Sequence, residues 1–480
     1  MLHSLKYLFA KNTKTRGSKK MLTTILHKFR KIITPKFISR IASTLKFNQR
    51  CTGKVTGLNF IKMLVAQVSS GRSFNYSNLN TTLSAISNND INISNQALAE
   101  YFYKSKSVQL IKSVFEEIFT FQKDQYLQKF GHLKIEQNTI NLFNRILVED
   151  STTCTLEESL EFTYKGSGGS KCKSSLKINV IHELRTSAII KLGIAEGRVS
   201  DLTFARGILD ELIEGDLVLR DLGYFILDTL EEIKNKKAFF ISRYKSTATI
   251  FLTSDDSKAI DLGRYLGYEY AQSPNQTFDK VVYIGLEKIA VRMVAYKMPF
   301  EVANSRRCKA KKDAAKRGYT ATAGRLSLCD YVILITNIPQ DMVKAEVIGT
   351  IYRIRWSIEL MFKSWKSTLN LQLSLRGRKA TRIECLVYAI LIVCLLTTVI
   401  NLYLKRLLSP GDKEISLDKL IKWLVNTHGY ECLVFGSISK LTEGIQNNLR
   451  ELLAQKRKRK TTIERVVNGE SYMDKYAANF

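Results

Sequence analysis

The spacing of apolar residues along the middle of the chain predicts strands first and then an alternation of helices and strands. Short apolar runs, typical of buried strands, occupy residues 145–150, 176–181, 188–194, 216–221 and 238–243. Residues 202–213 and 224–233 instead place apolar side chains three and four positions apart, as amphipathic helices do. This order predicts an α/β fold in which helices flank a mixed sheet.

Residues 246–330 interrupt this alternation with three further apolar runs. The runs lie at 249–252, 281–286 and 289–296, and their lengths suit strands. We therefore expect a mostly β insertion, after which residues 331–405 complete, with a late helix, the core begun at 141–245. Residues 1–140 and 406–480 have helical periodicity, which predicts helical regions before and after the core.

Residues 351–366 carry the most informative polar pattern in the chain. Four residues at offsets of 0, 3, 7 and 14 lie close to one face of a helix: Tyr352, Arg355, Glu359 and Lys366. An apolar set lies largely on another face: Ile351, Ile354, Ile358, Met361 and Phe362. Such a helix packs on one side and suits a metal ion and a phosphate on the other. An amphipathic helix with solvated charges is nevertheless the commoner structure at this spacing.

Two aspartates follow predicted strands in the same way. Asp150 lies at or just past the last residue of its strand, and Asp221 repeats the pattern, with Gly223 marking the exit into the next helix. Residues at strand ends sit on the rim of a sheet, where loops build sites. Taken alone, each aspartate is more commonly a turn-forming or helix-capping acid. Glu149 and Asp216 are weaker candidates, because alternation or a strand-start position points them elsewhere.

Together these residues resemble the motifs of bacterial insertion-sequence transposases of the DDE type. The Y-x2-R-x3-E-x6-K signature of that group is matched from Tyr352 to Lys366, and the aspartates stand in the matching sequences Asp150-Ser-Thr and Asp221-Leu-Gly-Tyr. Members of the group cut and join DNA with a ribonuclease H-like domain that carries an insertion at this place. The resemblance implies that fold and that activity for residues 145–400.

In this interpretation three carboxylates form a metal site: Asp150, Asp221 and Glu359. Transfer of a phosphodiester builds negative charge on the attacking and the leaving oxygen, and two divalent ions about 4 Å apart stabilise both. Carboxylates suit Mg²⁺, for which Mn²⁺ can substitute, and we expect Asp150 to bridge the two ions. The five histidines are scattered, so they offer no competing transition-metal site.

Further residues are expected to contact DNA. The resemblance implies phosphate contacts beside the carboxylates for Tyr352, Arg355 and Lys366. Arginine makes forked phosphate contacts and lysine supplies a point charge, which supports the same role on physical grounds. Trp356 and Trp365 either stack on an unpaired base or fill the core, the commoner role of a tryptophan beside an apolar stripe.

The net charge of +30 and the pI near 9.7 are typical of a protein that binds nucleic acid. No Asp or Glu precedes Asp90, so residues 1–140 are interpreted as a basic DNA-binding region. A disordered tail or a mitochondrial-type presequence is the alternative for residues 1–20. In the insertion, a basic cluster is expected to clamp the transposon end: Arg306, Arg307, Lys311 and Lys312. Such clusters predict salt-sensitive DNA affinity.

Residues 385–404 are long and apolar enough to span a bilayer. We interpret them as a buried helix that supports the sheet, with a membrane anchor as the alternative. Eight cysteines without close pairs, and no signal peptide, predict reduced thiols in the bacterial cytoplasm, where the partner is the DNA of the nucleoid.

The preferred hypothesis is a DDE transposase that binds the inverted ends of its insertion sequence, cleaves them with Mg²⁺ and transfers the strands to a target. The alternatives are a catalytically silent, element-derived DNA-binding protein, such as a repressor of transposition, and a Mg²⁺ nuclease that does not transpose. Bringing two ends together requires two active sites, so we expect a homodimer on double-stranded DNA. The partly apolar helices expected at 417–453 are the candidate interface.

Overall fold

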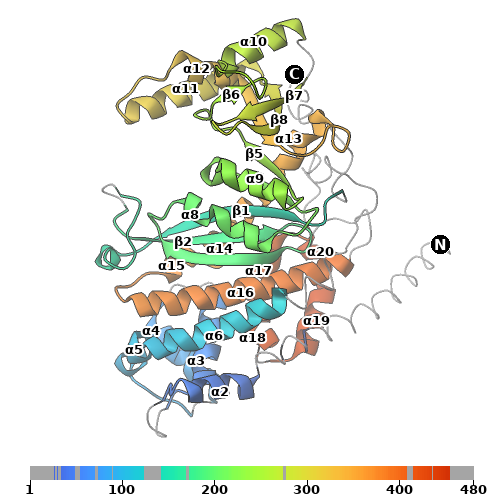
Figure 1. Cartoon of the computed structure of the whole chain (residues 1–480). Helices are drawn as coiled ribbons and strands as arrows, with labels where there is room; N and C mark the ends of the chain where they lie inside the picture. The colour runs from blue at the N-terminus through green and yellow to red at the C-terminus, as the bar shows by residue number, and fades with distance from the viewer. Residues whose placement is uncertain are drawn as a thin grey trace, which may run out of the picture.

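A computed structural model describes the greater part of the chain (Figure 1). The described residues are 26–27, 30, 34–48, 54–70, 74–88, 90–123, 142–168, 172–273, 277–407, 415–434 and 436–453. The alternatives raised for residues 1–20 therefore concern a segment outside the described residues. Figure 1 shows three tiers: the insertion at the top, the sheet of the core in the middle, and a long helix with the N-terminal helices below.

One nine-stranded sheet forms the centre. Its strands are β1 (Ile146–Thr155), β2 (Ser175–Glu183), β3 (Ala188–Glu196), β4 (Leu217–Arg220), β5 (Phe239–Arg243), β6 (Ile250–Phe251), β7 (Phe278–Ile284), β8 (Ile289–Lys297) and β9 (Tyr331–Thr336). The spatial order is β3-β2-β1-β4-β5-β9-β8-β7-β6. β1, β2 and β3 pair antiparallel, whereas β1, β4 and β5 pair parallel. This half of the sheet has the ribonuclease H-like arrangement, which confirms the predicted fold class.

Helices cover the sheet and precede it. The N-terminal helices are α2 (Pro35–Thr44), α3 (Gly57–Ser69), α4 (Tyr76–Ile86), α5 (Asn95–Tyr103) and α6 (Ser105–Phe121). Those between the strands are η3 (Glu158–Leu160), α8 (Asp201–Ala205), η4 (Arg206–Glu211), η5 (Leu222–Tyr224), α9 (Leu227–Asn235), α10 (Leu262–Gln272), α11 (Phe300–Lys316), α12 (Ala323–Ser327) and η6 (Leu328–Asp330). After β9 come α13 (Ala345–Arg353), α14 (Trp356–Ser367), α15 (Leu371–Ser374), α16 (Ala380–Leu407), α17 (Leu417–Asn426), α18 (Gly429–Val434), α19 (Ile438–Asn447) and α20 (Leu449–Leu452). Thr34 and Thr56 cap α2 and α3, because their hydroxyl oxygens accept backbone N–H groups of the first turn.

Side chains of β1 alternate between two hydrophobic cores. Ile146 and Val148 belong to a large core that includes α14, α16 and the N-terminal helices, whereas Leu147 belongs to a smaller core with α9 and α10. Asp150 follows Val148 by two residues, so its side chain lies on the same side of β1 as that of Val148. Its side chain therefore emerges on the side of the sheet that α14 covers.

The long helix α16 is buried. Its segment Ala380–Asn401 has a mean hydropathy of 2.6, and 89% of its most apolar stretch is buried inside the chain. α16 packs against α3, α6 and β3, and Figure 1 shows it running beneath the sheet. Burial accounts for the apolar sequence, as the interpretation of a supporting helix predicts.

The insertion is mixed α/β rather than mostly β. Its three apolar runs form β6, β7 and β8, as predicted, and β9 connects them to the core sheet. The prediction missed α10 and α11, which together are longer than the three strands. The buried residues of α11 are Ala303 and Ala314, so the helix has no apolar stripe that periodicity could reveal.

The apolar sides of the C-terminal helices are buried within the chain. Leu420, Leu424, Leu441 and Ile445 are buried in the large core of the same chain. The apolar pattern that indicated a dimer interface at 417–453 is therefore accounted for by packing within the chain.

A buried ion pair joins β1 to β4. Two guanidinium nitrogens of Arg220 donate to Oε2 of Glu149 at 3.1 and 2.7 Å, and both side chains are fully buried. Burial raises the pKa of Glu149 to about 7, and the arginine opposes that rise. Because two guanidinium nitrogens reach one carboxylate oxygen, Arg220 is the group that stabilises the charged form of Glu149 in this buried position.

Glu149→Leu should lower the free energy of unfolding by about 3–5 kcal/mol, because it leaves the Arg220 guanidinium buried without its partner. The double variant Glu149→Leu/Arg220→Leu should be more stable than the single one, since it removes both charges. Urea unfolding followed by circular dichroism measures both. A single variant as stable as the parent would contradict the importance of the pair.

Candidate active site

The parallel pairing of β1 with β4 brings two aspartates side by side. The last pair of this ladder is Glu149 and Arg220, so Asp150 and Asp221 come next along their strands. β1 itself continues to Thr155, which corrects the prediction that Asp150 ends its strand. The pairing with β4 nevertheless stops before Asp150, and the sheet opens at both aspartates.

Glu359 lies on α14, which packs against β1. The predicted single helix is in fact two, because α13 and α14 are separated at Ile354 and Arg355, where hydrogen bonds of the i to i+3 kind replace helical ones. Both residues keep right-handed helical backbone angles. The signature residues therefore keep nearly the relative directions that a continuous helix would impose.

The Arg355 guanidinium connects the two sides of the site. Nη1 lies 3.0 Å from Oδ2 of Asp150, and Nη2 lies 2.7 Å from Oε1 of Glu359. The arginine side chain is 13% exposed, so water and salt screen these ion pairs little. One cation thus holds a strand acid and a helix acid together.

The three acids share one open cavity of about 660 Å³. Its lining consists of Asp150, Ser151, Thr152, Asp221, Arg355, Glu359, Phe362, Lys363, Lys366 and Ser367. Lys363 and Lys366 are exposed on its wall. The cavity therefore combines acids with lysines that an anionic ligand can reach.

The acids influence one another. Burial raises the pKa of Asp150, and the negative charges of Asp221 and Glu359 raise it further, while the Ser151 N–H and Arg355 oppose the rise. Burial alone would lower the pKa of Arg355, but the neighbouring acids and Tyr352 outweigh it and raise that pKa. The negative charges of the neighbouring acids therefore disfavour the charged form of Asp150, and a nearby cation favours it.

Other predicted DNA contacts occupy different surroundings. The Tyr352 hydroxyl donates to the backbone carbonyl of Arg220 at 3.1 Å, and burial raises its pKa. This tyrosine therefore braces the strand that precedes Asp221. Trp365 is 3% exposed, as core packing predicts, whereas Trp356 is 58% exposed, so core packing was the wrong expectation for it.

The basic cluster of the insertion divides into two groups, neither of which lines the acidic cavity. Arg306 donates to the carbonyl oxygen of Tyr331 at 2.7 Å, and Arg307 forms an ion pair with Asp330. These arginines hold α11 against the start of β9. The lysines of α11 are instead exposed: Lys309, Lys311, Lys312 and Lys316.

Two basic residues near the site were missed from the sequence. Arg220 pairs with Ser242, so the exposed Arg243 at the end of β5 lies in register with Asp221. Lys363 follows Glu359 by one helical turn. Arg243 could have been found as the residue that ends the predicted strand at 238–243. Lys363 could have been found from its position four residues after Glu359, on the same side of the helix.

Comparison with known proteins identifies the family. Residues 141–396 match the family described as Transposase DDE domain. The chain belongs to this family. DDE transposases cleave DNA, transfer the cut strands and depend on divalent metal ions. The predicted resemblance is thereby confirmed at the level of the family.

Relatives of this DDE transposase include proteins of similar length. The transposase for insertion sequence element IS231B of Bacillus thuringiensis subsp. berliner is 28% identical over 73% of each chain. That for IS231E of B. thuringiensis subsp. finitimus is 27% identical over 94% of each chain. That for IS1151 of Clostridium perfringens is 26% identical over 79% of this chain and 81% of its own. Among solved structures, a piggyBac transposase synaptic complex with hairpin DNA aligns with a TM-score of 0.43 and 11% identity, over 92% of this chain and 87% of that one.

The donors of the transposase site suit a hard divalent cation. Within the part of the chain that the structure describes, no three His, Cys, Asp or Glu side chains converge closely enough to ligate a metal ion. Arg355 instead pairs with two of the three carboxylates. The donor set is all carboxylate, and burial, with a smaller contribution from Asp221 and Glu359, raises the pKa of Asp150, so a bound divalent cation would stabilise its charged form.

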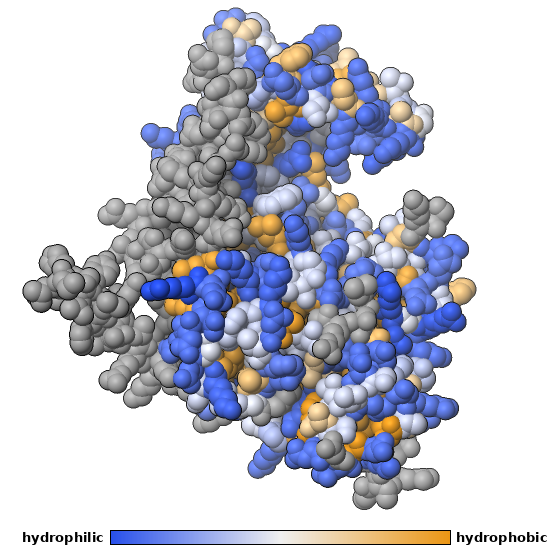
Figure 2. Space-filling model, turned by 180° about the vertical axis from the view of Figure 1, so that it is seen from behind, coloured by the Kyte–Doolittle hydropathy of each residue, from blue (hydrophilic) through white to orange (hydrophobic). Residues whose placement is uncertain are grey.

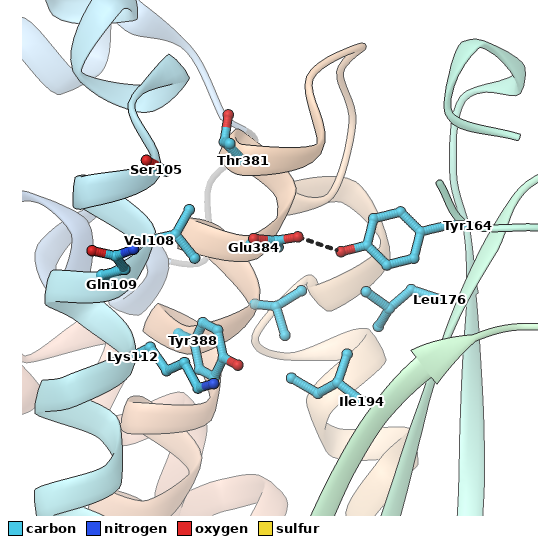
Figure 3. A pocket seen from close by; sticks show the side chains of 11 residues that line it. Ser105, Val108, Gln109, Lys112, Tyr164, Leu176, Ile194, Thr381, Glu384 and Tyr388 are labelled. Carbon is cyan, nitrogen blue, oxygen red and sulfur yellow. Dashed lines mark hydrogen bonds between the residues drawn. The ribbon is translucent and has the colours of Figure 1, made fainter. Parts of the chain in front are cut away.

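A second cavity of the transposase, about 450 Å³ in volume, lies between α6, α16 and the sheet (Figure 3). Apolar side chains such as Val108 and Leu176 line it, and the Tyr164 hydroxyl donates to Glu384 at 2.9 Å. Glu384 is its one lining acid among the described residues. This cavity therefore lacks the carboxylates that metal-dependent cleavage requires.

Arg355→Ala should bind Mn²⁺ about fivefold more tightly than the parent in the absence of DNA, because the arginine no longer competes for two carboxylates. A partly buried ion pair of this kind is worth about 1 kcal/mol. Calorimetric titration measures the affinity. Arg378→Ala is the matched control, since that exposed arginine pairs with Glu157 outside the cavity. Unchanged or weaker binding by Arg355→Ala would show that the arginine does not occupy the metal position.

Proposed function

We propose that Asp150, Asp221 and Glu359 bind two divalent ions, Mg²⁺ or in its place Mn²⁺, and that the chain cleaves the inverted ends of its own insertion sequence and transfers them to target DNA. The observation that carries this proposal is the shared cavity, in which three carboxylates and Arg355 meet. The names of the relatives, transposases for insertion sequence elements, support the choice of substrate.

The side chains have separate tasks in this proposal. Bound divalent ions would stabilise the charge that grows on the attacking and leaving oxygens. Arg355 leaves the carboxylates when DNA arrives and binds a backbone phosphate, to which its planar guanidinium is suited. Lys363 and Lys366 add positive charge on the wall of the cavity. Trp356, exposed one turn before Glu359, contacts a base or the sugar beside the cut.

Outside the cavity, exposed basic side chains bind the phosphates of the DNA. The lysines of α11 are exposed on the insertion, and in Figure 2 hydrophilic residues predominate on the upper lobe, above the notch at its right side. At the other end of the molecule, residues in α2 and between α2 and α3 expose further cations: Lys36, Arg40, Lys46 and Lys54. We propose that both regions bind phosphates of the transposon end.

Two element ends require two active sites, so we propose that the transposase acts as a homodimer assembled on double-stranded DNA. Its place of action would be the nucleoid in the bacterial cytoplasm. The buried state of α16 supports a role as a core helix rather than as an anchor.

Asp150→Asn, Asp221→Asn and Glu359→Gln should each reduce cleavage more than about a hundredfold, because residues that merely orient metal ligands already contribute ten- to a hundredfold to metal affinity. Mg²⁺-dependent cutting of a supercoiled donor with the element ends measures the loss. DNA binding in EDTA, measured by gel shift, should remain. Cutting by all three variants at the parental rate would refute the assignment, and a parent that binds but never cuts would favour a silent DNA-binding protein. Cutting without joined products would favour a nuclease.

Lys311→Gln/Lys312→Gln should weaken DNA binding and reduce the slope of log affinity against log salt by about 1 to 2, since each phosphate contact releases counterions. Lys234→Gln/Lys236→Gln, which changes two exposed lysines at the end of α9, is the matched control. Fluorescence anisotropy across a salt series compares the slopes. Equal slopes for the two variants would remove α11 from the DNA interface.

A further inference from the structure

Asp201, the first residue of α8, contacts the segments that carry both aspartates of the site. Its Oδ1 accepts a hydrogen bond from the Ser151 hydroxyl, one residue after Asp150, at 2.8 Å. Its Oδ2 lies against Gly223, two residues after Asp221, where an added Cβ would approach it to 3.0 Å. One carboxylate therefore binds the side chain beside Asp150 and packs against the turn after Asp221.

Lys177 of β2 holds Asp201 in this position. Its Nζ lies 3.0 Å from Oδ1 of Asp201 and donates to the carbonyl oxygen of Val199 at 2.5 Å. The lysine side chain is 11% exposed. Because the lysine is bound at two points and largely shielded from water, it fixes the carboxylate and balances its charge.

Asn179 and Tyr224 connect β2, the neighbour of β1, to the turn after Asp221. Asn179 stands directly opposite Ser151 in the pairing of β1 with β2, and its amide donates to the Tyr224 hydroxyl at 2.7 Å. Tyr224 is buried at the end of η5, the turn that follows Asp221. The polar contacts thus join β1, β2, α8 and η5.

Apart from Ser151, the residues that make these contacts are not among those that line the acidic cavity. Successive side chains of a strand point to opposite faces, so Ser151 turns toward Asp201 while Asp150 turns toward α14. Asp201 is absent from the described lining of the cavity. Any effect of Asp201 on metal binding therefore passes through the residues that it holds.

We propose that Asp201 is a positioning residue of the metal site, which fixes the separation of Asp150 and Asp221 by binding the Ser151 hydroxyl and packing against the turn at Gly223. This inference rests on the proposed function, in which those two aspartates are metal ligands. Residues that orient metal ligands typically contribute ten- to a hundredfold to metal affinity.

The test is a calorimetric Mn²⁺ titration of the full chain without DNA, with Asp201→Asn and Asp201→Ala. Both variants should bind Mn²⁺ at least about tenfold more weakly than the parent. In DNA cleavage, the Mn²⁺ concentration for half-maximal rate should rise by the same factor, whereas the rate at saturating Mn²⁺ should stay near the parental value. A general loss of folding would instead lower the saturated rate and the unfolding temperature together.

Asp210→Asn is the matched control, because Asp210 forms a 3.1 Å ion pair with Lys191 and does not line the cavity. It should bind Mn²⁺ as the parent does. If Asp150→Asn retains parental Mn²⁺ binding, the ligand assignment fails and the inference with it. If Asp150→Asn loses binding while the Asp201 variants keep parental affinity, the positioning role alone is overturned. Should Asp201→Ala not fold, the isosteric Asp201→Asn decides between these outcomes.

Discussion

The register between the parallel strands β1 and β4 is the constraint on which the site depends. It ends at the pair of Glu149 and Arg220, whose buried ion pair lies directly behind the two aspartates. Because side chains alternate along a strand, a slip of one residue would turn Asp150 to the opposite face and away from α14. The same pair that stabilises the core therefore decides which acids meet at the open edge of the sheet.

Charge compensation is the second principle of the site. Three acids gather in a chain with a net charge of +30, and repulsion between them is relieved in this structure by Arg355. In the proposed mechanism a divalent ion would take the place of Arg355 at Asp150 and Glu359. The guanidinium would then be available to bind a phosphate, so the proposal couples metal binding to the arrival of DNA.

Much of this arrangement could be predicted from the sequence, because buried strands appear as apolar runs and strand-end acids stand out beside them. The break before α14 could not, since the backbone at Ile354 and Arg355 remains helical and leaves the residue spacing unchanged. The role of Arg306 depends on Tyr331, a partner distant in the sequence. The helix α11 was missed because it has no apolar stripe, and the exposure of Trp356 was missed because apolar character alone does not say which surface a residue faces.

The most direct test is a structure of the transposase with its element end and Mn²⁺, in which anomalous scattering locates the ions. The account predicts ions coordinated directly by carboxylate oxygens of Asp150, Asp221 and Glu359, with Arg355 moved onto a DNA phosphate. Ions bound away from these carboxylates, with Arg355 still paired to Asp150 and Glu359 beside the DNA, would contradict it.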